Sequence, residues 1–244
     1  EISLNNKNFL KLLNKTRISI SNDDTRHYLN GIFLHLTEAH GRNFLTGVAT
    51  DSHRLSSSSV EVEKASNFTS LILPRKTVFQ LCSLLAESNE KLSMQTSENK
   101  IKFNLGNIKL ISKVIDGKFP DYKKVVPTDN SKCLIVPSKD FINSIERVAS
   151  VSLDRKEGVK LTIKKENIQL SVNSVSSGEG NEIIKANFNS DNLNISFNSK
   201  YLIDIVSEVE DSNLKMNLKD SVSPVLIEDT SDKNSYYVIM PMKI

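Results

Sequence analysis

The order of predicted secondary structure repeats once along the chain, and this repeat constrains the fold more than any other feature of the sequence. In each half a helix is followed by strands, a second helix and further strands. The helical periods cover residues 7–17, 75–86, 139–149 and 198–209. The links between strands are mostly short, as antiparallel hairpins require. The pattern predicts an α+β fold of two tandem units, 1–127 and 128–244, each with two helices packed on one face of antiparallel sheet.

Runs of alternating or β-branched apolar residues predict the strands. A glycine leads the strand 31–36 in the first half and its counterpart 158–163 in the second, and the helix starts at 74–76 and 198–200 also correspond. This agreement supports a duplication. The predicted strands are 1–4, 28–36, 44–49, 60–62, 70–73, 92–95, 100–105, 109–115, 133–136, 158–163, 168–172, 182–188, 192–197, 214–218, 222–228 and 236–240.

Composition argues against several kinds of site. Cys82 and Cys133 are too few for a disulfide framework or a cysteine metal site. The glycines are isolated rather than grouped into a phosphate-binding loop. The histidines lack the spacing of metal ligands, so neither a metal nor a cofactor is expected; they are His27, His35, His40 and His53. With no signal peptide and no apolar run near the ~18 residues of a membrane span, we expect a soluble intracellular protein.

Positive charge is concentrated in the first half of the chain. The net charge is +3, but residues 1–126 carry 18 Lys and Arg against 12 Asp and Glu, whereas residues 127–244 carry 14 against 17. The helices share in this charge, because Lys7, Lys11 and Lys15 fall on one arc of the first helix. Basic helix faces without a recognition motif suit sequence-independent contact with the phosphates of duplex DNA. The candidate DNA-facing residues are Lys7, Lys11, Lys15, Arg17, Arg75, Lys76, Lys139, Arg147 and Lys200.

A polar segment, Thr50–Leu55, interrupts an otherwise apolar pair of strands. One interpretation is a hydrolase active site in which Ser52, His53 and Asp51 are nucleophile, base and orienting acid. The other is a structural corner or pocket wall in which Asp51 pairs locally with Arg54. Neighbours on a strand point to opposite faces, whereas triad members must converge, so adjacency argues against catalysis.

The C-terminal segment, 236–244, is apolar where a chain end is usually polar. Pro241 lies between Met240 and Met242 and cannot continue a strand ladder, which predicts that the tail leaves the sheet. Methionine-rich exposed surface suits adaptable peptide binding. A last strand that packs into the core is the alternative interpretation.

Five motifs carry a resemblance to a known family. They are Arg26-His27-Tyr28-Leu29-Asn30-Gly31, Ala49-Thr50-Asp51-Ser52-His53-Arg54-Leu55, Pro74-Arg75-Lys76, Asp116-Gly117-Lys118-Phe119-Pro120-Asp121-Tyr122 and Val238-Ile239-Met240-Pro241-Met242-Lys243. With these motifs in this order, the chain resembles bacterial DNA polymerase III beta subunits, the sliding clamps, over essentially its whole length. It is similar to the middle and C-terminal domains of the three clamp repeats, without the first.

The resemblance implies a non-catalytic processivity factor of DNA replication in the bacterial cytoplasm, associated with the nucleoid. Two subunits of such a clamp form a head-to-tail homodimer, a six-domain ring with helices inside and sheets outside, around duplex DNA. Residues near Ser150 and Val151 would belong to the dimer interface, and without the first domain this chain alone is not expected to close the ring. A hydrolase and a β-rich scaffold without nucleic-acid function remain the alternatives.

The resemblance also implies a pocket between the middle and last domains, which takes short motifs of clients such as the polymerase catalytic subunit, the clamp loader and repair proteins. Ser52 replaces the family's usual glycine, His27 a tyrosine and Pro224 a serine, and Lys124 and Lys243 replace arginines, so motif preference is expected to differ. The implied pocket residues are Arg26, Tyr28, Leu29, Thr50, Ser52, His53, Arg54, Leu55, Pro120, Lys124, Val125, Asn198, Tyr201, Pro224, Val238, Ile239, Met240, Pro241, Met242 and Lys243.

Overall fold

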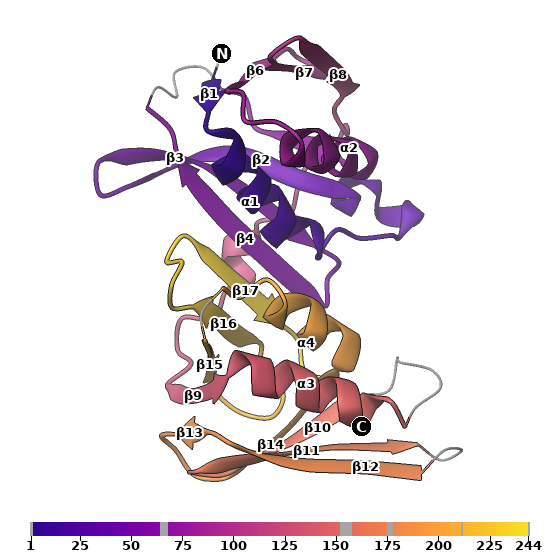
Figure 1. Cartoon of the computed structure of the whole chain (residues 1–244), viewed down its shortest axis with the longest axis vertical. Coiled ribbons are helices and arrows are strands. Elements are labelled where there is room, and N and C mark those ends of the chain that lie inside the picture. Colours follow the sequence, from indigo (N-terminus) through magenta and orange to yellow (C-terminus); the bar gives the residue numbers. More distant parts are fainter. Residues whose placement is uncertain (1, 64–67, 152–157, 175–177, 211, 244) are drawn as a thin grey trace. The chain divides into compact units, whose positions relative to one another are not determined.

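The computed structural model describes residues 2–63, 68–151, 158–174, 178–210 and 212–243 (Figure 1). The chain separates into two units, Glu1–Asp121 and Tyr122–Ile244, whereas the sequence predicted a division after residue 127. The predicted α+β class is confirmed, with two α-helices and antiparallel sheets in each unit. In the described part of the chain, no helix has the length and apolar character needed to cross a membrane.

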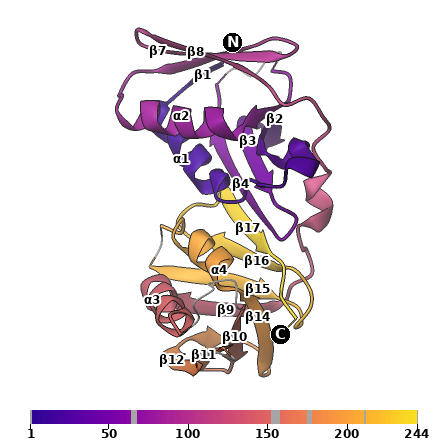
Figure 2. The same ribbon diagram turned by 90° about the vertical axis from the view of Figure 1, so that its right-hand side faces the viewer.

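The described residues of the first unit form two α-helices and antiparallel sheets in which four strands each follow in order. The strand orders are β1-β6-β7-β8 and β4-β3-β2-β5. The helices α1 and α2 pack side by side, α1 against β2, β3 and β4 and α2 against β2 and β5 (Figure 2). The elements are β1 (Ile2–Leu4), α1 (Asn6–Arg17), the 3-10 helix η1 (Asp24–Leu29), β2 (Gly31–Ala39), β3 (Arg42–Thr50), β4 (Arg54–Glu61), β5 (Leu71–Pro74), α2 (Arg75–Ala86), β6 (Leu92–Thr96), β7 (Lys100–Leu105) and β8 (Ile108–Lys113).

The second unit repeats this plan. Its strand orders are β12-β11-β10-β14 and β13-β9-β15-β16-β17, and α3 packs against α4. The elements are the 3-10 helix η2 (Tyr122–Val125), β9 (Lys132–Pro137), α3 (Ser138–Ala149), β10 (Gly158–Ile163), β11 (Asn167–Ser174), β12 (Gly178–Lys185), β13 (Asn187–Phe188), β14 (Leu193–Asn198), α4 (Ser199–Val206), β15 (Asn213–Leu218), β16 (Val225–Asp229) and β17 (Ser235–Ile239).

Each unit is itself built from two copies of a strand–helix–three-strand motif, and the copies exchange their first strands. In the first unit β1 pairs with β6, with Ile2 opposite Met94, and β5 pairs with β2, with Gly31 opposite Pro74. In the second unit β9 pairs with β15, and β14 pairs with β10. The repeat is therefore fourfold along the chain, finer than the twofold repeat predicted from helix order.

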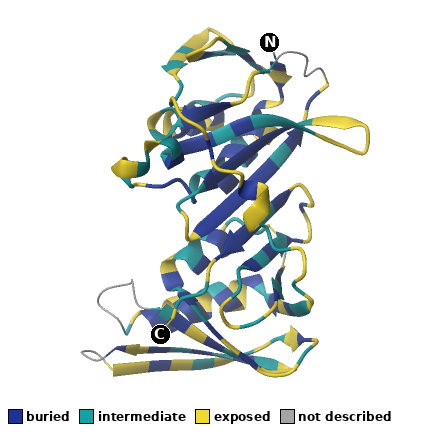
Figure 3. Ribbon diagram, turned by 180° about the vertical axis from the view of Figure 1, so that it is seen from behind, coloured by how far each residue is buried: buried dark blue, intermediate teal, exposed yellow. Residues whose placement is uncertain are grey.

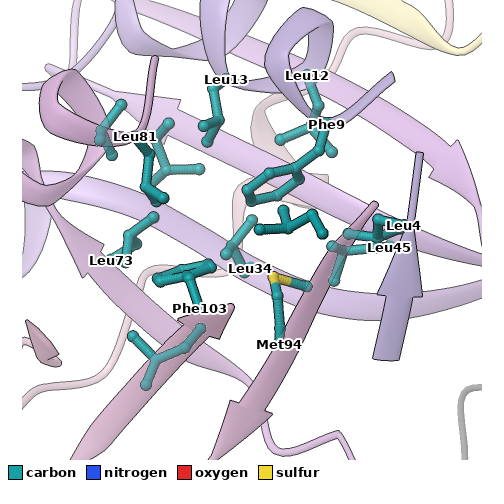
Figure 4. Close-up of a cluster of buried hydrophobic side chains, with 14 of the residues drawn as sticks. Leu4, Phe9, Leu12, Leu13, Leu34, Leu45, Leu73, Leu81, Met94 and Phe103 are labelled. Carbon is teal, nitrogen blue, oxygen red and sulfur yellow. The ribbon is translucent and has the colours of Figure 1, made fainter. Parts of the chain in front are cut away.

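Apolar residues from both helices and both sheets of the first unit form its core. Phe9, Leu12 and Leu13 of α1 face Leu81 of α2 and, from the sheets, Leu34, Leu45, Leu73, Met94 and Phe103 (Figure 4). The rings of Phe9 and Phe103 lie 6.3 Å apart between centroids. Exposed residues gather at loops and strand ends, as at the tip of the β2–β3 hairpin (Figure 3). The helical spacing of the apolar residues thus produces the observed packing.

The strand predicted over residues 28–36 begins only at Gly31, because η1 occupies the residues before it. Asp23 caps η1 through its carboxylate, which accepts a hydrogen bond from the Thr25 N–H at 2.9 Å. The Asn30 N–H donates a hydrogen bond to the His27 carbonyl at 3.0 Å, which closes the turn.

Four consecutive serines, residues 56–59, lie outside the predicted strands but form the centre of β4. β4 runs without a break from Arg54 to Glu61, opposite β3. Ser56 is fully buried and shares a 2.6 Å hydrogen bond between hydroxyls with Ser19, and Ser59 does the same with Thr46 at 2.8 Å. Serine hydroxyls are small enough to pack once a partner satisfies their hydrogen bonds, and sequence alone does not identify that partner.

Several predicted element ends also change. The third helix was predicted from residue 139, but α3 begins at Ser138, and Pro137 precedes it without a side-chain cap. The strand predicted from residue 222 begins at Val225, because the Asp220 carboxylate holds the Val222 and Ser223 N–H groups in a turn. Residues 1 and 244, part of the first predicted strand and of the tail, lie outside the described residues.

Candidate functional site

The Thr50–Leu55 segment is the turn that joins β3 to β4. Thr50 pairs with Leu55 across the ladder, and the Thr50 hydroxyl donates to the Arg54 carbonyl at 2.7 Å. The Asp51 carboxylate accepts hydrogen bonds from the N–H groups of His53 and Arg54 at 2.9 and 3.0 Å. It also forms a salt bridge with the Arg54 Nε at 3.1 Å. The local Asp51–Arg54 pair expected in the structural interpretation is confirmed.

Ser52 lies at the tip of this turn with a positive φ of 77°. This left-handed conformation favours glycine, because a Cβ atom approaches the following carbonyl oxygen. The guanidinium of Arg26 reaches across from η1 and donates from Nη1 to the Ser52 hydroxyl at 2.5 Å. Its Nε donates to the Asp23 carboxylate at 2.8 Å. Arg26 therefore links η1 to the β3–β4 turn.

The same contacts speak against a hydrolase. A serine nucleophile needs a neighbouring base, and the Arg26 guanidinium at its hydroxyl has no acceptor site for the proton. The carboxylate of Asp51 is occupied by two backbone N–H groups and Arg54. Both residues therefore hold the shape of the turn.

Two members of the predicted pocket wall are buried rather than accessible. Arg54 is 7% exposed and Leu55 is 2% exposed, although the family resemblance implied both as pocket residues. Arg54 is drawn in by Asp51, and Leu55 is held by pairing with Thr50. Ser52 and His53 are exposed, and Thr50 is half-buried. These three residues form the accessible surface of the turn.

The Asp116–Asp121 motif packs beside η1 in the first unit. The His27 Nε2 atom hydrogen-bonds to the Asp116 carbonyl at 3.1 Å. Gly117 has a φ of 143°, and a Cβ atom there would lie 3.1 Å from the Cβ of Tyr28. The Phe119 ring stacks on Phe33 with centroids 5.0 Å apart. These contacts explain the glycine and the phenylalanine, and leave Pro120 exposed.

The C-terminal tail leaves the sheet after β17, as expected from Pro241. Val238 and Ile239 are buried in the strand, whereas Met240, predicted as its last residue, lies beyond it and is 39% exposed. The tail then runs beside β14, where the Met242 N–H donates to the Ser196 carbonyl at 2.7 Å. The segment thus combines both sequence interpretations: a packed strand followed by a tail outside the sheet.

The other predicted pocket residues of the second unit lie on three of its elements. Asn198 caps α4 by accepting a hydrogen bond from the Tyr201 N–H at 3.1 Å. The Pro224 carbonyl accepts a hydrogen bond from the Asn130 side chain at 2.9 Å, just before β16. Lys124 and Val125 belong to η2, and Val125 is 51% exposed.

On the helices of the first unit the predicted basic face is only partly accessible. Lys7 and Lys76 are exposed, and Lys11, Arg17 and Arg75 are half-buried. Lys15 is only 2% exposed, so its expected place on the exposed face is wrong. Successive steps of four residues drift by about 40° around a helix, which carries Lys15 roughly 80° from Lys7 toward the apolar side.

The helices of the second unit carry cations that are partly neutralised. The Arg147 Nε donates to the Glu182 carboxylate at 2.9 Å, and this hydrogen bond raises the pKa of Arg147 and lowers that of Glu182. The Lys200 Nζ lies 3.3 Å from the Asp204 carboxylate. Lys139 is exposed. Ser150 ends α3, with its hydroxyl donating to the Arg147 carbonyl at 2.7 Å, and Val151 is half-buried.

Comparison with known proteins gives a consistent result along the whole chain. Residues 3–121 match the central domain of the DNA polymerase III beta subunit, and residues 123–243 match its C-terminal domain. The beta sliding clamp of Caulobacter vibrioides is 34% identical over 244 residues, which are 100% of this chain and 66% of that protein. The chain thus spans just under two thirds of this relative's length.

Solved structures agree. The subunit beta of Bartonella birtlesii bound to griselimycin has a TM-score of 0.96 and 38% identity, over 100% of this chain and 66% of that one. A second structure from the same organism has a TM-score of 0.91 and 35% identity, over 99% of this chain and 67% of that one. The chain belongs to the DNA polymerase III beta subunit family, and contains its central and C-terminal domains.

Proposed function

We propose that this chain is part of a sliding clamp, a non-catalytic processivity factor that encircles duplex DNA during replication in the bacterial cytoplasm. Support comes from the match to two successive clamp domains in their family order. A ring holds DNA by enclosing it, so its inner surface needs only weak contacts that allow sliding. Electrostatic attraction to phosphates, which does not depend on sequence, meets this requirement.

We propose that α1 and α2 supply most of this attraction. The two helices contain six Lys and Arg residues and no Asp or Glu. The helices α3 and α4 contain three of each, Lys139, Arg147 and Lys200 against Asp140, Glu146 and Asp204, and are neutral overall. With Lys15 buried, the proposed DNA-facing cations of the first unit are Lys7, Lys11, Arg17, Arg75 and Lys76.

Ring closure needs open edges at which further domains add. β8 is the edge strand of its sheet and leaves Ile111 63% exposed. β12 is the edge strand of its own sheet and leaves Ile183 65% exposed. Exposed hydrophobic edge strands are usually covered in soluble proteins. We therefore propose that a preceding domain covers β8, and that β12, with the α3 end at Ser150 and Val151, belongs to the head-to-tail dimer interface.

For client proteins, among them the polymerase catalytic subunit and the clamp loader, we propose a peptide site with contributions from both units. The accessible contributors of the first unit are His53, Ser52, Thr50 and Pro120, with Arg26, Tyr28 and Leu29 beside them and Arg54 and Leu55 as buried supports. Those of the second unit are Met240, Pro241, Met242 and Lys243, with Lys124, Val125, Asn198, Tyr201, Pro224, Val238 and Ile239. The exposed turn and the tail that leaves its sheet are the features that favour a peptide ligand.

The peptide site is tested with a fluorescent peptide that carries a clamp-binding motif and with two changes, His53→Ala and deletion of residues 240–244. Both should weaken peptide binding, because His53 and Met240 are exposed, while the thermal melt stays nearly unchanged. The control is His40→Ala, which removes an exposed histidine from the β2–β3 turn. Unchanged affinity together with a large loss of stability would contradict the assignment.

A further inference from the structure

Phe79 of α2 is an exposed aromatic residue in a basic surface. Its side chain is 41% exposed, although every other phenylalanine on the α-helices is buried. The Arg17 Cζ, at the end of α1, lies 5.4 Å from the centre of its ring, and the Arg75 Cζ lies 5.3 Å from it. Neither guanidinium forms a salt bridge with a described residue. Two cations that can rotate toward a ligand therefore flank one accessible ring.

A shallow groove of about 570 Å³ runs along this part of α2. Its lining has a cation pair at one end and polar side chains that can donate and accept hydrogen bonds at the other. Because neither α1 nor α2 contains a carboxylate, the groove attracts polyanions without local repulsion. The lining residues are Arg75, Lys76, Phe79, Gln80 and Ser83.

We propose that this groove binds single-stranded nucleic acid, with an unpaired base stacked on Phe79 and neighbouring phosphates bound by Arg17, Arg75 and Lys76. Single-strand sites combine cationic tracks with aromatic rings, because each unpaired base offers a flat face for stacking. In a duplex the bases are already stacked, and only their edges and the phosphates are accessible. A duplex therefore gains from the three cations but not from the ring. The proposal goes beyond the duplex binding of a clamp.

The contacts of Phe79 also join α1 to α2, so loss of the ring can affect stability as well as binding. Phe79→Leu separates the two effects, because leucine keeps an apolar side chain at the helix surface and removes the aromatic face. Thermal melting of the variant shows whether the helices remain packed. A control, Val222→Ala, removes an exposed apolar side chain from the second unit, which does not contain the basic helices α1 and α2.

The test measures fluorescence anisotropy of the full chain with labelled oligothymidylate and with a duplex of the same length, at low ionic strength. Phe79→Leu should weaken binding of the single strand at least about fivefold, which corresponds to about 1 kcal/mol, and change duplex binding less than about twofold. Arg75→Ala/Lys76→Ala should weaken both, because the phosphates are common to both ligands. Val222→Ala should change neither.

The result separates this inference from the clamp proposal. Equal losses for single strand and duplex in Phe79→Leu, or no loss for either, would overturn the stacking site, as would a wild-type chain that binds the duplex but not oligothymidylate. A chain that binds the single strand through Phe79 but shows no duplex affinity at any salt concentration would support the stacking site and contradict duplex binding by these helices.

Discussion

At the scale of single residues, the β3–β4 turn shows what sequence reasoning can and cannot reach. Because Asp51, Ser52 and His53 are consecutive in the sequence, a catalytic triad was correctly disfavoured. The expected Asp51–Arg54 pair is present. The exposure of Arg54 could not be predicted, because it depends on where the chain folds back over the guanidinium. The same holds for Lys15, whose helical position was predicted and whose burial was not. The contact of Arg26 with Ser52 had no sequence signal, since 26 residues separate the two.

Ser52 should destabilise the turn through its backbone conformation. With φ at 77°, a side chain at this position costs about 1 kcal/mol relative to glycine. We expect Ser52→Gly to unfold at higher denaturant concentration than Ser52→Ala, with a difference of about 1 kcal/mol in the free energy of unfolding. Both variants lack the hydroxyl that Arg26 contacts, so their difference reports the backbone alone. Equal stability of the two variants would contradict the expectation.

Asp23 should make the stability of the folded chain depend on pH in the acidic range. Hydrogen bonds from the Thr25 side chain and Arg26 lower the pKa of its carboxyl from 3.8 to about 2. As pH falls, the unfolded chain therefore takes up the proton first. The ionised Asp23 carboxylate therefore stabilises the folded chain fully well above pH 3.8, and this stabilisation is lost as pH falls toward about 2.

We expect the difference in free energy of unfolding between the wild type and Asp23→Asn to shrink over this interval, measured by urea titration at successive pH values. Asp24→Asn is the matched control. It removes the neighbouring carboxylate and keeps the contacts of Asp23, so the acid-dependent loss should persist. A difference that does not vary with pH would show that these hydrogen bonds do not act in solution.

At the scale of elements, periodicity predicted all four helices to within a few residues at each end, because each has apolar residues at helical spacing. Strands with apolar alternation were also found, among them β7 and β10 with their observed bounds. Only the end of β4 was found, within the predicted strand 60–62, because the four serines at its centre carry no hydrophobic pattern. The pairing of β1 with β6 was out of reach as well, since register depends on contacts between residues far apart in the sequence.

The buried serine pair should make a measurable contribution to β4. Ser19 and Ser56 are both fully buried, with their hydroxyl oxygens 2.6 Å apart. Replacing either with alanine leaves the other hydroxyl without this partner, at a cost of about 1–3 kcal/mol. In the double variant no hydroxyl is stranded, so we expect its loss of stability to be smaller than the sum of the single losses. Additive losses in denaturant unfolding would show that the two side chains act independently.

At the scale of the whole molecule, the sequence already showed more cations in the first half, and the structure locates the contrast on the helices. The α1–α2 pair has only cations, whereas α3 and α4 pair Arg147 with Glu182 of β12 and Lys200 with Asp204. Helical spacing alone gave no indication of the partner of Arg147, because Glu182 lies on a strand 35 residues away. The basic character of the proposed DNA surface is therefore uneven.

This unevenness predicts an unequal response of duplex binding to charge removal. Lys7→Ala/Lys76→Ala removes two exposed cations of the first unit. It should weaken duplex affinity and reduce the slope of log K against log salt by about 1 for each phosphate that the variant no longer neutralises. Lys139→Ala/Lys200→Ala removes the same formal charge from the second unit and should have a smaller effect, since Lys200 already pairs with Asp204. Titrations with labelled duplex at several salt concentrations measure both slopes. Equal reductions would contradict a first unit that dominates binding.

The exchange of first strands also determines when the strands can pair while the ribosome synthesises the chain. β1 emerges early but finds its partner only when Met94, opposite Ile2, has been synthesised. At about 5–20 residues per second, that wait lasts roughly 5 to 18 s. During this time α1 can pack on β2, β3 and β4, but the core residues that contact the later sheet, such as Phe9 opposite Phe103, remain open to other chains or to chaperones. Each unit must therefore be synthesised almost entirely before its core can close. Slow codons between β5 and β6 should then prolong the time during which apolar residues of the first unit are exposed.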